Sequence, residues 1–420
     1  MYKIENVIRD YAWGSTTAIA DFLGRPAQGG PEAELWIGAH PDSPSVAVLA
    51  DGSQEPLDAL ISSDPRHFLG DQSVQEFGPR LPFLAKILAA DTPLSLQVHP
   101  SLEQAREGFK KENDAGVPTG APYRNYRDDN HKPEMIFALT DFEALCGFRP
   151  ASETREIFAY LARLVAESGQ DVPPLLGGLI ADLSAANEAT ALRAAFQRII
   201  AGGEEVTSAT ALAVEALEAA RAAGASAVAG LQPAFDTVLN LNELYPGDPG
   251  VLNSLLLNRI SLSPGEAVYL PAGKVHAYLK GLGVEVMAAS DNVLRGGLTP
   301  KHIDVPELLK TIRFESVAVP RLETVATVLG QELYQPPFRE FQLQRIELAP
   351  GSAPVPLAQA GAAVLIVASG SVFLDSPKGD LKLERGESAF LPAAEAPVNV
   401  HPAAGSTGPA VAFAVTTALR

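Results

Sequence analysis

Four polar residues, Gln97, His99, Glu134 and His276, have the types and spacing of a metal-binding set. Gln97 and His99 lie two residues apart in the segment Leu94–Pro100, in which apolar and polar residues alternate. In a β-strand this alternation sends the apolar residues into the core and places the polar ones together on the other face. An amide oxygen and a ring nitrogen at this spacing can reach one ion. Taken alone, the segment also fits an ordinary solvated strand face, because short motifs recur by chance.

The other two residues come from separate predicted strands. His276 lies in a second alternating segment, Val275–Lys280, and Glu134 follows Pro133 at the start of an apolar run. Proline cannot donate to a sheet ladder, so Pro133 fits the first residue or the edge of a strand. A mixed set of nitrogen and oxygen ligands suits Zn²⁺, and a set that leaves room for water makes a Lewis acid rather than a structural clip.

A second group of polar residues lies in the segment 285–301, which reads as a loop. It contains the turn Ser290-Asp291-Asn292, then Arg295 before two glycines, and ends at Lys301. Loops on a rigid scaffold often carry site residues, so Arg295 and Lys301 could contact an anion or a carbonyl group. The alternative is a solvated loop with two surface cations.

The remaining histidines give weaker signals. His67 and His401 are expected at the surface or in loops, and His302 is expected to be exposed at a turn. His40, in Gly38-Ala-His-Pro41, fits a turn as well as a pocket. Because histidine is often only partly buried, a structural role is expected for all four.

The elements that must position these residues are predicted to be strands on both sides of a helical insertion. Strand and turn patterns run to about residue 150, and a helical period begins after Ser152, a plausible N-cap. Alanine-rich helical sequence continues to about residue 257, where strand patterns resume. We therefore predict a mainly β protein with a helical insertion at 151–257, which forms a wall of the cleft.

An internal repeat indicates that the β part consists of two similar modules. Leu262–Ala272 and Leu383–Ala393 share the pattern Leu-x-x-Gly-Glu-small-x-aromatic-Leu-Pro-Ala. A turn followed by a short strand, present twice, is typical of jelly rolls and sandwiches. The copies then diverge, since His276 corresponds to Pro397. We expect a metal in the first module alone.

Composition limits the partners and the compartment. With 50 acidic and 32 basic residues, the formal net charge is −18, which argues against nucleic acid or an anionic membrane as a partner. An anionic substrate would then need a local basic cluster. The one cysteine, Cys146, excludes an internal disulfide and suits a reducing compartment. The sequence shows no signal peptide and no apolar membrane span, so the cytoplasm is the expected location.

Several motifs together resemble the type I mannose-6-phosphate isomerases. They occur in order from the N-terminus to about residue 310: Tyr11-Ala-Trp-Gly14, Ala33-Glu-Leu-Trp-Ile-Gly-Ala-His-Pro41, Leu94-Ser-Leu-Gln-Val-His-Pro100, His131-Lys-Pro-Glu134, Leu270-Pro-Ala-Gly-Lys-Val-His-Ala-Tyr278 and Ser290-Asp-Asn-Val-Leu-Arg-Gly-Gly-Leu-Thr-Pro-Lys301. The resemblance implies two cupin-type jelly rolls with a helical domain inserted. The implied limits are 1–150 with 258–320 for the catalytic module, 151–257 for the insertion and 321–420 for a second module without metal ligands.

The resemblance also implies roles for particular residues. It implies one zinc ion per chain on Gln97, His99, Glu134 and His276, and a catalytic Arg295. It further implies a substrate pocket near Trp13, Lys132, Tyr278, Glu285 and Asp291, with the substrate phosphate near Ser95, Lys86 and Lys301. Lys86, Lys132, Arg295 and Lys301 would supply the basic cluster that the acidic composition otherwise lacks.

The implied reaction interconverts mannose 6-phosphate and fructose 6-phosphate through an enediol. A cation stabilises the developing negative charge and a positioned group moves the proton between carbons 2 and 1. Lys132, His131, Glu285 and Asp291 all remain open as the proton carrier. Two rivals stay in view: an Fe(II) oxygenase of the cupin class using His99, His276 and Glu134, and a sugar-binding double cupin without activity. The sequence does not specify an oligomeric state, and a monomer is compatible with it.

Overall fold

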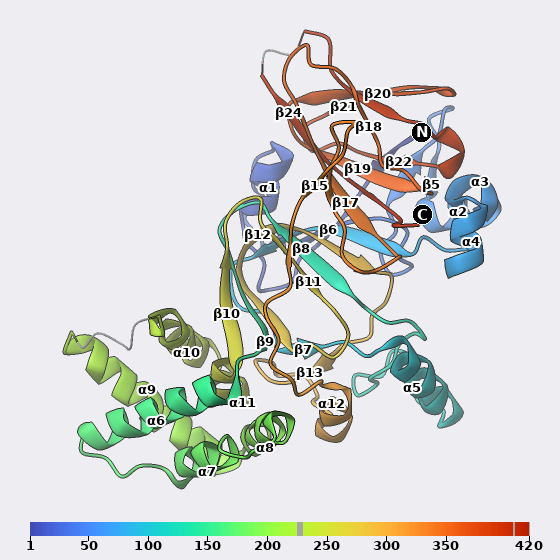
Figure 1. The fold of residues 1–420 in the computed structure, drawn as a ribbon. Coiled ribbons are helices and arrows are strands. Elements are labelled where there is room, and N and C mark those ends of the chain that lie inside the picture. The colour runs from blue at the N-terminus through green and yellow to red at the C-terminus, as the bar shows by residue number, and fades with distance from the viewer. Residues whose placement is uncertain (225–229, 406–407, 420) are drawn as a thin grey trace.

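The computed structural model describes residues 1–224, 230–405 and 408–419, and within them the strands form three sheets (Figure 1). The 11-stranded sheet carries Gln97, Glu134, His276 and Arg295. Its strands are β2 (Val7–Arg9), β3 (Glu34–Ile37), β6 (Phe83–Ala90), β7 (Gln97–Val98), β8 (Glu134–Ala138), β9 (Phe142–Phe148), β10 (Leu257–Leu262), β11 (Ala267–Leu270), β12 (His276–Ala288), β13 (Leu294–Arg295) and β14 (Arg321–Leu322).

Strand β12 joins the two layers of this sheet. Its first residues pair with β7 and β9, whereas its second half pairs with β6 and β8. The change of partners occurs at Gly281, whose φ of +130° favours glycine and where a Cβ would lie 2.7 Å from the carbonyl oxygen of Asp141. One strand therefore carries His276 on one layer and Glu285 on the other.

The other two sheets are formed mainly by the C-terminal part of the chain. The nine-stranded sheet contains β1 (Tyr2–Glu5), β4 (Val46–Val48), β5 (Gln54–Pro56), β15 (Val325–Ala326), β16 (Glu332–Tyr334), β17 (Gln342–Leu348), β19 (Ala363–Ser369), β22 (Ser388–Leu391) and β24 (Ala410–Thr416). The four-stranded sheet contains β18 (Val355–Pro356), β20 (Ser371–Ser376), β21 (Gly379–Glu384) and β23 (Asn399–Pro402). Strand β1 pairs with β22, so the N-terminal segment contributes to a sheet formed mostly by residues 321–420, the range that the resemblance implies for the second module. The predicted domain limits remain a prediction.

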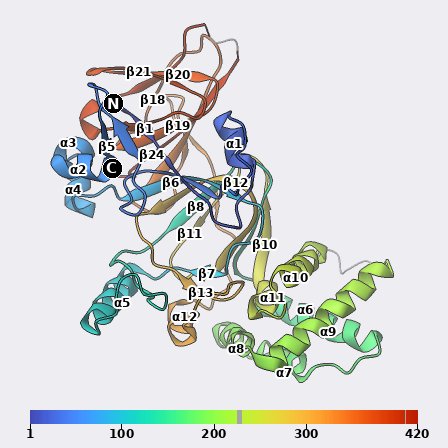
Figure 2. The same ribbon diagram turned by 180° about the vertical axis from the view of Figure 1, so that it is seen from behind.

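A block of helices occupies the sequence between β9 and β10. It contains α6 (Ala151–Glu167), α7 (Pro174–Asp182), α8 (Glu188–Ile200), α9 (Gly203–Ala222), α10 (Gln232–Leu244), α11 (Pro249–Asn253) and the 3₁₀ turn η1 (Ser254–Leu256). Their apolar faces share one core with Leu96, Val98, Val275, Ala277 and Leu294. These are the inward-facing partners of the polar residues on β7, β12 and β13, so the block backs the layer that carries His276. Figure 2 shows the block at the opposite end of the molecule from β20 and β21.

The remaining helices are short, apart from α5. They are α1 (Ala18–Leu23), α2 (Leu57–Ser63), α3 (Pro65–Leu69), α4 (Asp71–Phe77), α5 (Leu102–Asp114), α12 (Val305–Thr311) and the 3₁₀ turn η2 (Ala393–Glu395). Ser101 starts α5 with a capping box in which Gln104 bonds back to the Ser101 amide. Among the described helices, none combines the length and the apolar character needed to cross a membrane.

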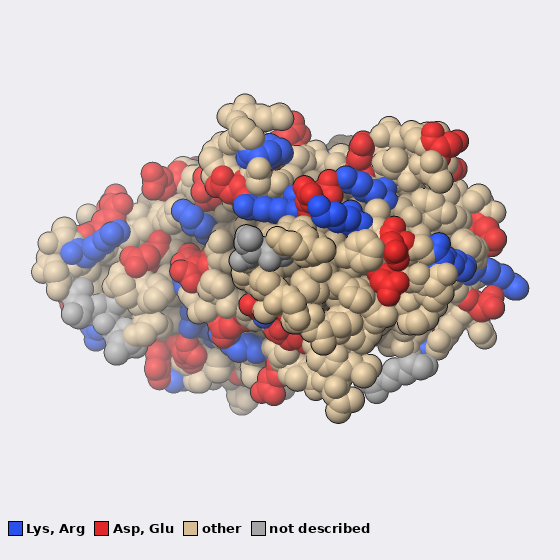
Figure 3. All heavy atoms as spheres, turned by 90° about the horizontal axis from the view of Figure 1, so that it is seen from above, with Lys and Arg blue, Asp and Glu red and all other residues tan. Residues whose placement is uncertain are grey.

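One apolar core joins the two large sheets. It includes Ile87, Met135 and Val286 from the first and Leu343 and Phe413 from the second. On the surface, acidic and basic side chains are interspersed over the face shown in Figure 3. The net negative charge is therefore not spread as a single-sign field over that face.

Candidate metal centre

Three of the four predicted ligands meet in a buried cluster. Glu134 lies between the two histidines, with Oε1 at 3.3 Å from His99 Nε2 and Oε2 at 3.3 Å from His276 Nε2. One ligand atom from each residue lies within 4.8 Å of the others, and all three residues are buried. This arrangement has the size and the donor types of a site for one divalent metal ion.

Strand geometry brings the ligands together as the alternating pattern predicted. Leu94, Leu96 and Val98 are buried, while Gln97 on β7 lies opposite His276 on β12 and opposite Arg295 on β13. Glu134 is the first residue of β8, directly after Pro133, which needs no ladder partner there. Gln97, Glu134 and His276 lie on three separate strands, as expected, and His99 follows directly after β7. Their role as metal ligands stays a prediction.

Hydrogen bonds behind the histidines orient their rings. His99 Nδ1 lies 2.8 Å from the carbonyl oxygen of Asn292, and His276 Nδ1 lies 3.0 Å from that of Lys274. A carbonyl oxygen only accepts, so each Nδ1 donates its proton to that oxygen and each ring turns Nε2 toward Glu134. Burial lowers the pKa of His99 to about 4, which keeps the ring neutral and able to bind a metal.

The cluster therefore fits a bound cation. His99 Nε2 is buried and has no hydrogen-bond partner. It faces Glu134 Oε1 at 3.3 Å, so a lone pair and a carboxylate oxygen face each other without a proton between them. Burial would raise the pKa of Glu134, but Lys132 and the histidines hold it well below its ordinary value. An orphaned ring nitrogen beside a charged carboxylate is satisfied by a metal ion.

Gln97, the fourth predicted ligand, lies at the edge of this cluster. It is half-buried, and its Nε2 lies 3.4 Å from the hydroxyl oxygen of Ser95 on the same face. The register places it between His276 and Arg295.

Two of the predicted cations are paired with buried carboxylates. Lys132 Nζ lies 3.0 Å from Glu134 Oε1. Lys86 Nζ lies 3.0 Å from Glu285 Oε2 and 3.4 Å from Glu34 Oε1. Burial would lower the pKa of Lys86, but these two carboxylates raise it above its ordinary value. The positive charge of each lysine is therefore balanced by a carboxylate. Both lysines are less available to an anionic substrate than expected from the sequence.

Arg295 and Lys301 have the opposite environment. Burial and repulsion by Arg127 lower the pKa of Arg295, and burial, Arg295 and Arg127 lower that of Lys301. Among the described residues, neither Arg295 nor Lys301 forms an ion pair with a carboxylate that would offset this repulsion. Arg127 was missed from the sequence, where it was one basic residue in a polar loop. These three cations form the local positive charge that an anionic substrate requires.

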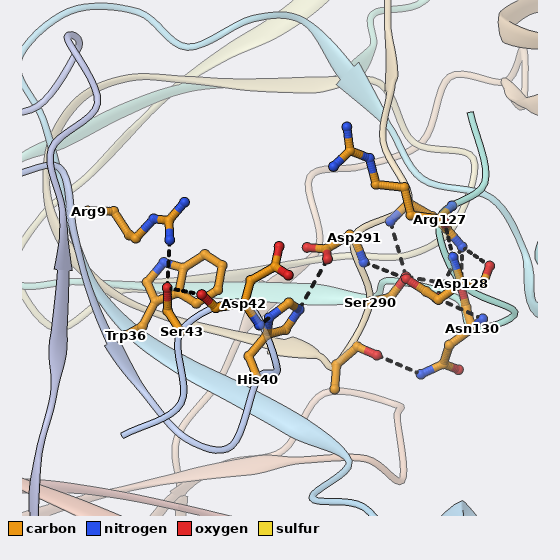
Figure 4. A network of polar contacts seen from close by, with 12 residues as sticks. Arg9, Trp36, His40, Asp42, Ser43, Arg127, Asp128, Asn130, Ser290 and Asp291 are labelled. Carbon is orange, nitrogen blue, oxygen red and sulfur yellow. Dashed lines mark hydrogen bonds and ion pairs between the residues drawn. The ribbon is translucent and has the colours of Figure 1, made fainter. Parts of the chain in front are cut away.

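Asp128 organises the turn at 290–292, as Figure 4 shows. Its carboxylate accepts from the Ser290 hydroxyl at 2.8 Å and from the Asp291 backbone N–H at 2.7 Å. It also accepts from the backbone N–H of Asn130 at 2.9 Å and from the side-chain amide of Asn292 at 3.2 Å. Since the Asn292 carbonyl oxygen contacts His99, Asp128 supports the metal centre from behind.

His40 is more closely involved than the sequence indicated. It is buried, and its Nε2 lies 3.3 Å from Asp291 Oδ2 (Figure 4). Both residues line a cavity of about 670 Å³, together with Arg127 and Asp128. Burial would raise the pKa of Asp291, but His40 lowers it. Asp291 is thus a charged carboxylate at a cavity wall. His67 and His302 are exposed as expected, and His401 is half-buried at 3.6 Å from Asp375.

The other predicted pocket residues lie around the same strands. Tyr278 is buried on β12 with its ring 6.1 Å from that of His276. Trp13 is half-buried and packs against the core cluster that contains Tyr278. The Nε2 atom of His131 lies 2.5 Å from Oε1 of Glu340. Glu340 belongs to the loop between β16 and β17 of the nine-stranded sheet.

Comparison with known proteins identifies the family. A family model described as "Phosphomannose isomerase type I, catalytic domain" matches residues 1–151. Mannose-6-phosphate isomerase from Escherichia coli (strain K12) is 40% identical over 405 residues, which cover 95% of this chain and 97% of that protein. The Rattus norvegicus protein of the same name is 34% identical over 417 residues, 94% of each chain.

Solved structures agree. A crystal structure of mannose 6-phosphate isomerase in its zinc-bound holo form matches with a TM-score of 0.85 and 36% identity, covering 100% of this chain and 99% of that one. A phosphomannose isomerase variant from Salmonella typhimurium matches with a TM-score of 0.87 and 36% identity over 100% of both chains. With these relatives matched along nearly its whole length, the chain belongs to the type I phosphomannose isomerase family and is an isomerase.

Proposed function

We propose that this isomerase interconverts mannose 6-phosphate and fructose 6-phosphate, with one zinc ion per chain held by Gln97, His99, Glu134 and His276. The observation that carries the proposal is the buried pair of His99 Nε2 and Glu134 Oε1, which face each other at 3.3 Å with no hydrogen-bond partner for the ring nitrogen. The 40% identity to the Escherichia coli mannose-6-phosphate isomerase supports the choice of substrate.

When bound, the ion would supply Lewis-acid stabilisation of negative charge on the sugar oxygens. Arg295 would stabilise the negative charge of the enediolate. Among the described residues, no carboxylate pairs with its guanidinium, so its positive charge is available to the substrate. Lys301 and the exposed Arg127 would attract the phosphate, with Ser95 as a further contact. Lys86 is proposed for the phosphate as well, although its pairing with Glu285 makes it the weaker choice.

The proton carrier between carbons 2 and 1 is proposed from the same four residues as before. Lys132 contacts Glu134, Glu285 contacts Lys86, and His131 contacts Glu340. Asp291 is one-third exposed at a cavity wall and is held charged by His40, so among the four it has the environment of an accessible base. Trp13 and Tyr278 would form apolar walls for the sugar ring.

We also propose that the sheets form two cupin-type jelly rolls. Strand β12, shared by two layers, and the Gly-Glu turn repeated at Gly265 and Gly386 support this architecture. Only the first module carries the ligand cluster among the described residues.

The test is a coupled assay for fructose 6-phosphate formed from mannose 6-phosphate, with the metal removed by a chelator and then restored. We expect turnover that is lost on chelation and returns with Zn²⁺. Oxygen uptake with added Fe(II) and no isomerisation would favour the oxygenase instead. Binding of the sugar phosphate without turnover in zinc-loaded protein would favour a binding protein.

A further inference from the structure

The second large sheet sends a loop to the metal-binding segment. This loop, residues 335–341, connects β16 to β17. Phe338 packs its ring edge against Tyr269 on β11, with the centroids 5.8 Å apart. Two residues further on, Glu340 Oε1 lies 2.5 Å from His131 Nε2. The module without metal ligands therefore contacts the segment His131–Glu134 directly.

Within that segment, neighbouring side chains have different partners. Lys132 Nζ contacts Glu134 Oε1 at 3.0 Å, at the metal cluster. His131 instead contacts Glu340, from another sheet. The Pro133 carbonyl oxygen accepts from the Ala288 backbone N–H at 3.0 Å, just before β8 begins at Glu134. The contact with Glu340 adds a side-chain anchor at His131, two residues before that backbone hydrogen bond.

We propose that Glu340 is a positioning residue that acts through His131. By holding His131, the C-terminal module fixes the segment that presents Glu134 to the metal and Lys132 to Glu134. The expected effect of Glu340 on turnover rests on the proposed function. Hydrogen-bonded groups behind metal ligands typically change metal affinity or activity 10–100-fold when removed. The C-terminal module would then serve the site without binding a metal.

The environment of Glu340 suits this role. The side chains of His131 and Glu340 are 22% and 13% exposed, so the pair is largely shielded from water. The second carboxylate oxygen accepts from the Arg339 backbone N–H at 3.1 Å, and the Arg339 carbonyl accepts from the Ala418 backbone N–H at 3.1 Å. The carboxylate is therefore fixed by its own module and aimed at His131.

The same loop offers a matched control. Arg339 forms an ion pair with Glu76 on α4, at 2.5 Å between NH1 and Oε1, with the side chains 57% and 36% exposed. This pair anchors the loop, and in the part of the chain that the structure describes it makes no contact with the segment His131–Glu134. Glu76→Ala and Glu340→Ala each remove one carboxylate that binds the loop, and only the second removes the contact with His131.

The experiment measures zinc affinity by competition with a chromophoric chelator and steady-state kinetics on the full chain. We expect Glu340→Ala to lose about 10–100-fold in zinc affinity or in kcat, with a smaller change in KM. Glu340→Gln, which can still accept from the imidazole, should recover part of the loss. Glu76→Ala should stay within about twofold of the wild type on both measures.

A double-mutant cycle with His131→Ala separates positioning from general destabilisation. If Glu340 acts through His131, Glu340→Ala should add less than about twofold to the effect of His131→Ala. Equal losses in Glu340→Ala and Glu76→Ala, full additivity in the cycle, or wild-type zinc affinity and kcat in Glu340→Ala would each overturn the proposal. Should Glu340→Ala fail to fold, Glu340→Gln decides: unchanged zinc affinity together with additivity in the cycle overturns the proposal. Failure of the proposed function would appear separately, as a zinc-loaded wild type without isomerase turnover, and the affinity measurements would still test Glu340.

Discussion

Replacing Asp128 by asparagine should destabilise the protein by an amount that the hydrogen bonds predict. One carboxylate oxygen accepts from Asn130, Ser290 and Asn292, and the other accepts only from the Asp291 backbone N–H at 2.7 Å. In the orientation of lowest free energy, the Oδ1 atom of the asparagine side chain accepts from the same three donors. Its NH₂ group then faces the Asp291 N–H, and one charge-assisted bond is lost.

The magnitude follows from two opposing effects. A hydrogen bond to a charged group contributes about 1.5–3 kcal/mol. Burial, together with the charge of Asp291, raises the pKa of Asp128, so a neutral side chain relieves part of an unfavourable charge. We therefore expect Asp128→Asn to cost about 1–2 kcal/mol. Asp128→Ala leaves the backbone N–H groups of Asn130 and Asp291 without this acceptor, whereas Ser290 and Asn292 still reach the Asn130 carbonyl oxygen. This variant should cost about 3 kcal/mol or more.

The assay is urea unfolding followed by tryptophan fluorescence, because Trp36 packs against His40 at 5.0 Å between ring centroids and reports on this region. The control is Asp129→Asn, at the adjacent position. Asp129 is 54% exposed and lies 3.9 Å from Arg80, so its replacement should change stability by no more than about 0.5 kcal/mol. Asp128→Asn and Asp128→Ala both within about 0.5 kcal/mol of this control would refute the reasoning.

Three further predictions concern the metal, the catalytic arginine and pH. Elemental analysis should find one zinc per chain, and the double variant His99→Ala, His276→Ala should lose it; two metals per chain, or full retention in the variant, would contradict the site. Arg295→Ala should slow kcat by ~10²–10³-fold with normal zinc content, and Arg295→Lys should recover only part, because lysine lacks the planar fork. Near-normal turnover of Arg295→Ala would remove its catalytic role. His131 lowers the pKa of Glu340 from its ordinary value of 4.5, although burial opposes this. The folded-state pKa lies below the unfolded one, so the stability contributed by Glu340 is present above about pH 4.5 and is lost as the pH falls through the folded pKa. The melting temperatures of the wild type and Glu340→Gln should therefore converge between about pH 6 and about pH 3, and a constant difference would contradict this linkage.

Local patterns in the sequence predicted the parts of the site that depend on local geometry. Alternation predicted that Gln97 and His276 each lie on the polar face of a strand, because side-chain direction in a strand follows from residue number alone. That these two strands pair is seen only in the fold. The contact between His131 and Glu340 joins residues 209 positions apart, and no local period reports such a contact. His40 was likewise undervalued, since its partner Asp291 lies far along the chain.

Ion pairing was the other feature that the sequence could not predict. The sequence shows Lys86 as a cation, but its ion pairing depends on which carboxylates the sheet register places opposite it. Glu285 lies directly across from Lys86 on β6 and β12, a relation that only the fold defines. The roles of the pocket residues, the domain limits and the location in the cell stay predictions.

The pairing of β1 with β22 has a consequence for synthesis of the protein. Tyr2 is translated early, yet its sheet partner Phe390 is translated near the end of this sequence. At about 5–20 residues per second, the first strand waits roughly 20–80 s before its partner exists. Until then β1 can pair with β4, but its other edge has no strand partner. The nine-stranded sheet is therefore completed late, and this edge of β1 stays open to pairing with other chains during translation.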